Sequence, residues 1–191
     1  NGARIIGADG PVLTISGAAL ADAGTYQLRV WNSIGTNISA NLPIEITKAL
    51  RVPSQFATIQ KAVDAAKDGD TIELASGQRY EGPIQIGEWP KWAKSLTVIG
   101  KGDSGSRPVV VNELKSMNNG GWLIIKNVRF ESLVYPWISG DTVFVDCEFA
   151  GPVSAASYGL AYINCLFLGN VEIQANYGKS PILLQNCTFA P

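Results

Sequence analysis

The chain has 191 residues, 46% of them hydrophobic, which is enough to bury one sizeable core or a medium core and a small one. Its 16 acidic and 15 basic residues nearly cancel without forming a basic stripe or a charge block, so nucleic acid is not an expected partner, and no apolar run approaches the roughly 18 residues that cross a membrane. Histidine is absent, which removes the commonest general base and the commonest metal ligand, and the low charged fraction of 16% suits an all-β secreted or cell-surface protein.

An alternating segment lies near the start of the chain, at residues 12–46. Apolar and polar residues alternate from Tyr26 to Val30, which predicts half-buried strands. The sequence DAGTY (22–26) resembles the tyrosine corner of immunoglobulin-like domains. A full domain of that kind needs about 100 residues and seven strands. We therefore expect residues 1–48 to be a partial immunoglobulin-like β-sandwich, the C-terminal half of a bacterial immunoglobulin-like domain, either cut from a larger sandwich or completed by another surface.

A short helical pattern follows, within FATIQKAVDAAKDGDTIEL (56–74). Four apolar residues recur there at helical spacing: Ile59, Ala62, Val63 and Ala66. Gly69 ends the helical pattern, and TIEL reads as a strand. We expect the helix to cap the end of a stack of strands, where it would cover apolar core and unpaired edge groups.

Two loops carry aromatic residues. GEWPKWAKS (87–95) is rich in turn formers, and LVYPWISGD (133–141) follows later in the chain. Exposed aromatic rings can stack on sugars. The alternative is that these rings pack over the stems of their loops. The candidate carbohydrate-binding residues are Trp89, Trp92, Tyr135 and Trp137.

A glycine-rich loop, GKGDSGSRP (100–108), lies between the two aromatic segments. It has some likeness to a phosphate-binding loop, but the helix that should follow such a loop is missing. We predict a long turn between strands.

The second half of the chain repeats one pattern four times: IIKNVRF (124–130), VFVDCEF (143–149), AYINCLF (161–167) and LLQNCTF (183–189). An Asn or Asp stands in the same column of each copy, with spacings of 19, 18 and 22 residues. A period near 20 residues is typical of stacked repeats.

The columns of this repeat predict where side chains point. Apolar residues stand two places before the Asn, and a Phe stands three places after it in every copy. Strand alternation therefore slips by one residue at the Asn. A sharp corner in the left-handed region explains the slip, because Asn and Asp tolerate that conformation best after Gly.

Strands, corners and a short period without intervening helices predict a parallel β-helix over residues 49–191, with coils stacked about 4.8 Å apart. Equivalent residues should then lie above one another. We expect an Asn/Asp ladder at the corner (Asn127, Asp146, Asn164 and Asn186), a Phe stack (Phe130, Phe149, Phe167 and Phe189) and a Cys stack (Cys147, Cys165 and Cys187).

The three cysteines are interpreted as small, buried core residues. A disulfide between neighbouring coils is an alternative that leaves one thiol unpaired. A catalytic cysteine is disfavoured because there is no histidine to activate it. The cysteine spacings fit no zinc pattern, so we predict neither a metal site nor a cofactor.

The region from residue 52 to 189 also resembles a known family. FATIQKAVDAAKDGDTIELASGQRYEGPIQI (56–86) follows an F-x-T-I-Q-x-A-V helix, an I-x-L strand, then G-x-Y and an acid. VFVDCEFAG (143–151) and AYINCLFLGNVEI (161–173) are similar to paired N-C-x-F-x-G coils. On these residues the chain resembles the pectinesterases and the wider pectin lyase-like superfamily. The resemblance implies a right-handed parallel β-helix; it is weaker support for an activity, because fold does not carry function.

The catalytic residues of that family are largely unmatched. Its first aspartate falls in GPVSAA (151–156), which has no acid, and its arginine motif has no counterpart. Glu172 stands at the second aspartate position. One carboxylate without an acid partner cannot easily hydrolyse an ester, so we predict no catalytic residues and a solvated Glu172. A divergent esterase or lyase would have to use Glu172, Asp141 or Glu131.

These features favour a non-catalytic extracellular structural or surface protein, a self-associating filament or adhesin module whose unfinished β surfaces pair head to tail. The alternatives are a carbohydrate-binding protein and a divergent pectinesterase-like enzyme. The expected partners are further copies of the chain or a polysaccharide.

Overall fold

The computed structural model describes residues 5–6, 12–15, 18–44, 46, 49–87, 94–117, 120–138, 141–157, 159–173 and 182–190. Its contacts divide the chain into two compact units, Asn1–Lys48 and Ala49–Pro191. Each unit is described by itself.

The described part of Asn1–Lys48 consists of short antiparallel pairs: β1 (Ile5–Ile6) with β2 (Thr14–Ile15), β3 (Gly24–Tyr26) with β6 (Leu42–Ile44), and β4 (Arg29–Trp31) with β5 (Thr36–Ile38). A 3₁₀ turn, η1 (Leu20–Asp22), precedes β3. The Tyr26 hydroxyl donates to the backbone oxygen of Asp22 at 2.7 Å, a contact typical of a tyrosine corner. The immunoglobulin-like classification of this unit stays a prediction.

The prediction of half-buried strands in this unit was wrong for its central hairpin. All three residues of β4 and all three of β5 are exposed. The hairpin is a two-stranded ribbon, and burial of a strand face needs a second layer against it.

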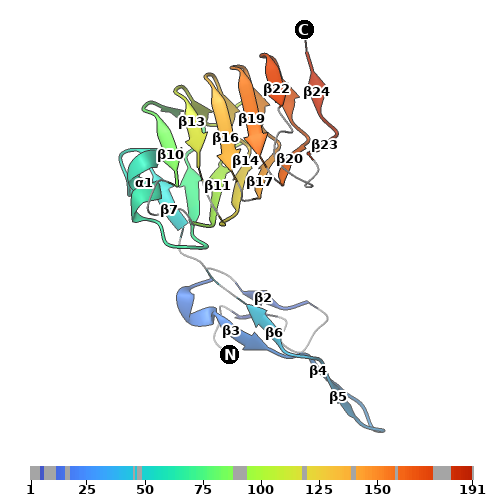
Figure 1. Ribbon diagram of the computed structural model, residues 1–191. Helices are drawn as coiled ribbons and strands as arrows, with labels where there is room; N and C mark the ends of the chain where they lie inside the picture. The colour runs from blue at the N-terminus through green and yellow to red at the C-terminus, as the bar shows by residue number, and fades with distance from the viewer. Residues whose placement is uncertain are drawn as a thin grey trace. The chain divides into compact units, whose positions relative to one another are not determined.

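The unit Ala49–Pro191 is a parallel β-solenoid of about five turns (Figure 1). Its described strands form three parallel sheets with seven, six and five members. The seven-stranded sheet contains β7 (Ala49–Val52), β8 (Thr71–Leu74), β11 (Leu96–Gly100), β14 (Leu123–Lys126), β17 (Thr142–Val145), β20 (Leu160–Ile163) and β23 (Leu183–Gln185). The six-stranded sheet contains β9 (Arg79–Tyr80), β12 (Val109–Val110), β15 (Arg129–Phe130), β18 (Glu148–Phe149), β21 (Leu166–Phe167) and β24 (Thr188–Phe189). The five-stranded sheet contains β10 (Ile84–Ile86), β13 (Leu114–Ser116), β16 (Val134–Ile138), β19 (Val153–Ser157) and β22 (Val171–Ile173). The predicted all-β class and parallel β-helix are confirmed, whereas the right-handed sense stays a prediction.

Helix α1 (Ile59–Ala65) covers the first coil, as expected. The Thr58 hydroxyl caps its start by accepting a hydrogen bond from the Lys61 amide at 3.2 Å. Ile59, Ala62 and Val63 are buried, and the helix packs against β7, β8 and β10. Figure 1 shows α1 at one end of the solenoid and β24 at the other.

The predicted corners are confirmed. Asn127, Asp146, Asn164 and Asn186 have φ angles of 53° to 55°, in the left-handed region. The Asn164 amide donates to the Asp146 side chain at 3.2 Å, and the Asn186 amide donates to Asn164 at 3.3 Å. These hydrogen bonds join successive coils at the corner.

The core contains the predicted aromatic stack. The rings of Phe130, Phe149, Phe167 and Phe189 lie in one file, with centroid distances of 5.4, 4.9 and 4.8 Å and interplanar angles of 9° to 13°. A second, unpredicted stack joins Phe144 to Tyr162 at 5.1 Å. Its rings meet Phe149 edge-on, so the two stacks lock together.

Candidate functional site

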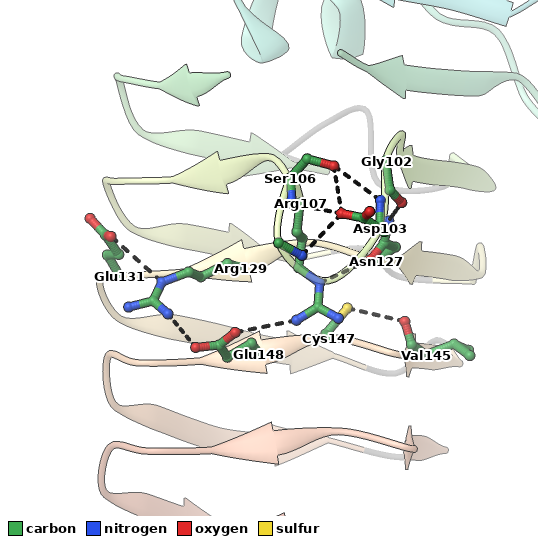
Figure 2. A network of polar contacts seen from close by, with 11 residues as sticks. Gly102, Asp103, Ser106, Arg107, Asn127, Arg129, Glu131, Val145, Cys147 and Glu148 are labelled. Carbon is green, nitrogen blue, oxygen red and sulfur yellow. Dashed lines mark hydrogen bonds and ion pairs between the residues drawn. The ribbon is translucent and has the colours of Figure 1, made fainter. Parts of the chain in front are cut away.

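A chain of ion pairs crosses the outward face of the six-stranded sheet (Figure 2). We call Arg79, Arg107, Arg129, Glu131 and Glu148 the charged network. Tyr80, Phe130 and Phe149 point inward, so their neighbours Arg79, Arg129 and Glu148 point outward.

Two arginines share Glu131. Arg79 donates to both carboxylate oxygens of Glu131, at 3.1 and 2.6 Å. The Arg129 Nε lies 3.6 Å from the same carboxylate. Val109 is in register with Arg79 on one side and with Arg129 on the other, so one coil lies between the coils of the two arginines. The Arg79–Glu131 ion pair therefore spans the strand that contains Val109.

Two arginines also share Glu148. Arg129 pairs with one carboxylate oxygen, and Arg107 lies 3.3 Å from the other. Arg107 also donates to the Asn127 side-chain oxygen at 2.9 Å. The side chains of Arg107 and Glu148 are largely buried. The charged network therefore connects four consecutive coils to a corner residue.

The loop of residues 100–108 holds Arg107 in place. The Asp103 carboxylate accepts hydrogen bonds from the Ser106 hydroxyl at 2.8 Å, the Ser106 amide at 3.0 Å and the Gly105 amide at 3.1 Å. These bonds lower the pKa of Asp103, the hydroxyl bond most. The Asn127 amide donates to the carbonyls of Gly100 and Gly102 at 3.0 and 2.8 Å. The segment is the long turn that we predicted.

The electrostatics around Glu131 favour its ionised form. Hydrogen bonding to Arg79 holds the pKa of Glu131 below its usual range, and Glu131 in turn raises the pKa of Arg79. An ionised carboxylate accepts hydrogen bonds and donates none. The arrangement is thus suited to holding coils together and poorly suited to general acid catalysis.

The other candidate carboxylates are not brought together with Glu131. Glu131 follows a strand of the six-stranded sheet, Asp141 precedes β17 of the seven-stranded sheet, and Glu172 lies on β22 of the five-stranded sheet. Glu172 is exposed and in register with Ser154 of the preceding coil. The prediction that the chain has no catalytic residues stays a prediction.

Of the four aromatic candidates, only Tyr135 has a described side chain. It is half-buried on β16, in register with Lys115 on the outward face of the five-stranded sheet. Trp137 belongs to the same strand, but its side chain lies outside the described residues, as do Trp89 and Trp92 altogether. Their roles stay predictions.

The cysteines lie in the core, as we interpreted them. Cys147 and Cys165 are buried, Cys187 is half-buried, and all three thiols are free. Their sulfurs contact backbone carbonyls, Cys147 that of Val145 and Cys165 that of Ile163, both at 3.4 Å. Burial raises the pKa of the Cys147 thiol, and its contact with the Cys165 thiol raises it further.

Tyr162 carries a buried hydroxyl beside these cysteines. The side chain is fully buried, and its hydroxyl has no hydrogen-bond partner among the described residues. Burial raises the pKa of Tyr162, and the charges that Cys165, Cys147 and Cys187 can carry raise it further. An unsatisfied buried hydroxyl is destabilising by itself.

The last described coil leaves apolar core exposed. Leu184 and Phe189 are 44% and 54% exposed, whereas their counterparts one coil earlier, Tyr162 and Phe167, are 0% and 1% exposed. Strands β23 and β24 are at the ends of their sheets and pair on one side only.

The sequence interpretation missed the charged network and the Tyr162 hydroxyl. A signal for the network was present, because Arg129 and Glu148 occupy the same outward column of adjacent repeats. Nothing comparable identified Arg79 or Arg107, which lie 52 and 41 residues from their partners.

Comparisons of the chain with protein-family models, curated proteins and solved structures found no match. The resemblances to pectinesterases and to immunoglobulin-like domains therefore stay predictions. In the described part of the chain, no helix is long and apolar enough to span a membrane. Within the same residues, no group of three or more Cys, Asp or Glu side chains is placed to hold a metal ion.

Proposed function

We propose that the chain is a non-catalytic structural module of a secreted or cell-surface protein, and that two copies associate through the last coils of their solenoids. The observation that carries this proposal is the exposed end formed by β23 and β24. Leu184 and Phe189 extend two side-chain columns of the core, yet they are about half exposed. A second β layer placed there would bury them and pair the free strand edges.

The residues along the exposed edge of β23 and β24 favour a second copy of the chain as the partner that pairs there. Strand edges that avoid pairing usually carry Lys or Pro. The segment LLQNCTF (183–189) contains neither, and it has no charged residue. A surface of this kind can meet its own copy without placing like charges together.

The geometry of the two ends favours contact between last coils. Helix α1 packs over β7, β8 and β10, so the first coil is already covered. Copies related by a two-fold axis would place their edge strands antiparallel. This contact closes on itself and yields a dimer, in contrast to the head-to-tail filament expected from the sequence.

A structural role is also supported by what the charged side chains do. Glu131 and Glu148, which could otherwise serve as acids or bases, are each shared between two arginines that come from different coils.

Sedimentation equilibrium over a range of concentrations tests the proposal. We expect a dimer for the wild type and a monomer for Leu184→Lys, because the lysine places a charge at the edge. Leu168→Lys is the matched control, since Leu168 is 41% exposed but lies outside the last coil's strands. A monomeric wild type, or a Leu184→Lys variant that associates as strongly as the control, would contradict the proposal.

Carbohydrate binding is a second candidate, favoured by the Tyr135 side chain on the outward sheet face beside Lys115. An aromatic ring can stack on the face of a sugar while a polar neighbour forms hydrogen bonds with the hydroxyl groups of the sugar. Affinity electrophoresis through a panel of polysaccharides tests this function. Retardation that is lost in Tyr135→Ala and kept in Tyr135→Phe would support it, and equal migration of all three proteins in every polysaccharide would rule it out.

A further inference from the structure

The cysteine column has a regular spacing set by the backbone. The Cys147 carbonyl accepts a hydrogen bond from the Leu166 amide, and the Cys165 carbonyl accepts one from the Thr188 amide, both at 2.9 Å. Each cysteine therefore lies one strand away from the next, a separation of about 4.8 Å. None of the three thiols is in a disulfide.

This spacing matches the reach of a linear metal bridge. Thiolates prefer soft ions such as Cu(I). A metal–sulfur bond is about 2.3 Å long, so two bonds in line span about 4.6 Å. An ion can therefore lie between two stacked sulfurs with little movement of the strands.

We propose that Cys165 and Cys187 bind a soft, two-coordinate metal ion of the Cu(I) class. Binding releases two thiol protons to solvent and leaves a complex with a single negative charge. Burial of a charge away from water is unfavourable. The outer pair is favoured over Cys147 and Cys165 because Cys187 is only half-buried, whereas Cys147 is 1% exposed.

The Tyr162 hydroxyl supplies a second, independent observation. It is buried, has no hydrogen-bond partner among the described residues, and lies in the same coil as Cys165. In the metal-bound protein this hydroxyl donates to a thiolate sulfur and offsets part of the negative charge. The group that destabilises the metal-free core thus becomes satisfied when the ion is present.

The column also provides matched control variants. Val128 occupies the cysteine position in an earlier coil, where it is buried, so valine fits this column. Cys147→Val, Cys165→Val and Cys187→Val therefore remove one thiol each with little change in packing. Cys187→Ser is a further variant at the half-buried position, and circular dichroism confirms which variants fold.

The test titrates the reduced full chain, without oxygen, with Cu(I) held by the competing chelator bicinchoninate. We expect one Cu(I) per chain in the wild type and in Cys147→Val, and loss of uptake in Cys165→Val, Cys187→Val and Cys187→Ser. X-ray absorption of the loaded wild type should show two sulfur ligands. Undiminished uptake by Cys165→Val, loss of uptake in a folded Cys147→Val, or three sulfur ligands would each overturn the proposed pair.

Tyr162→Phe separates a metal site from a purely structural column. We expect the variant to release Cu(I) to the chelator more readily than the wild type, and to melt at a higher temperature in the absence of metal because the unsatisfied hydroxyl is gone. Equal Cu(I) retention by Tyr162→Phe and wild type would overturn the role of the hydroxyl.

Discussion

At the scale of single residues, the corner asparagines determine how each coil turns. Asn164 has a φ of 55°, and its amide group both donates to Asp146 and accepts from Asn186. One residue therefore adopts the left-handed backbone conformation that the corner needs, and its side chain forms hydrogen bonds with the corner residues of both neighbouring coils.

We predict that Asn164→Ala destabilises the solenoid more than Asn164→Gly. Alanine pays about 1–2 kcal/mol for the left-handed backbone and also loses the amide contacts, each worth about 1 kcal/mol. Glycine loses the contacts but adopts the backbone freely. Urea unfolding of the two variants gives the comparison, and equal losses would show that backbone conformation is not what the asparagine provides.

The corner and the Phe stack could be predicted because a repeat compares one position with itself several times. The slip in alternation at Asn127, Asp146, Asn164 and Asn186 has one simple conformational explanation, and the structure agrees. The Tyr162 hydroxyl could not be predicted in this way. Its column otherwise holds Ile125, Phe144 and Leu184, so only the burial of a polar atom distinguishes it.

At the scale of elements, the strands of the six-stranded sheet are joined by side chains as well as by backbone hydrogen bonds. Because Arg79 reaches across β12 to Glu131, the charged network links strands that do not touch directly. Sequence separation hides such pairs, and only the register of stacked coils brings them together.

We predict that the network weakens in acid. The pKa of Glu131 is lowered in the folded chain, so its stabilising effect is present above the range in which a free glutamate titrates, about pH 4.3, and is lost as the pH falls below it. The difference in free energy of unfolding between wild type and Glu131→Gln should therefore shrink from about pH 7 to about pH 3.

The control for this prediction is the same substitution in an Arg79→Gln background. Removing the arginine takes away the main cause of the lowered pKa, so Glu131→Gln should then show a much weaker dependence on pH. A pH dependence that is unchanged by Arg79→Gln would assign the effect to another group.

At the scale of the whole molecule, the strands of each coil of the solenoid pair only with strands of the neighbouring coils, so local stability should depend on position. Strand β17 pairs with β14 and β20, whereas β23 pairs with β20 alone. For the chain diluted until it is monomeric, we predict slower amide hydrogen exchange in Thr142–Val145 than in Leu183–Gln185. Mass spectrometry of the exchanging chain measures both segments, and equal protection would indicate that the last coil is covered.

The two units were not equally predictable. The period of the repeat predicted the class of the solenoid, and the helical spacing of apolar residues predicted its capping helix. The first unit offers short strands without a repeat, and burial there depends on a second layer that alternation cannot specify. For this reason alternation predicted half-buried strands where β4 and β5 are exposed.

The regular corner has a consequence for how such a chain can vary over generations. Val145 and Ile163 both lead directly into a corner residue, one at Asp146 and the other at Asn164, 18 residues later. Recombination between these two points would delete or duplicate one complete turn without disturbing the residues on either side. The solenoid would become shorter or longer by about 4.8 Å. Its length can therefore change by whole turns through single deletions or duplications in the gene.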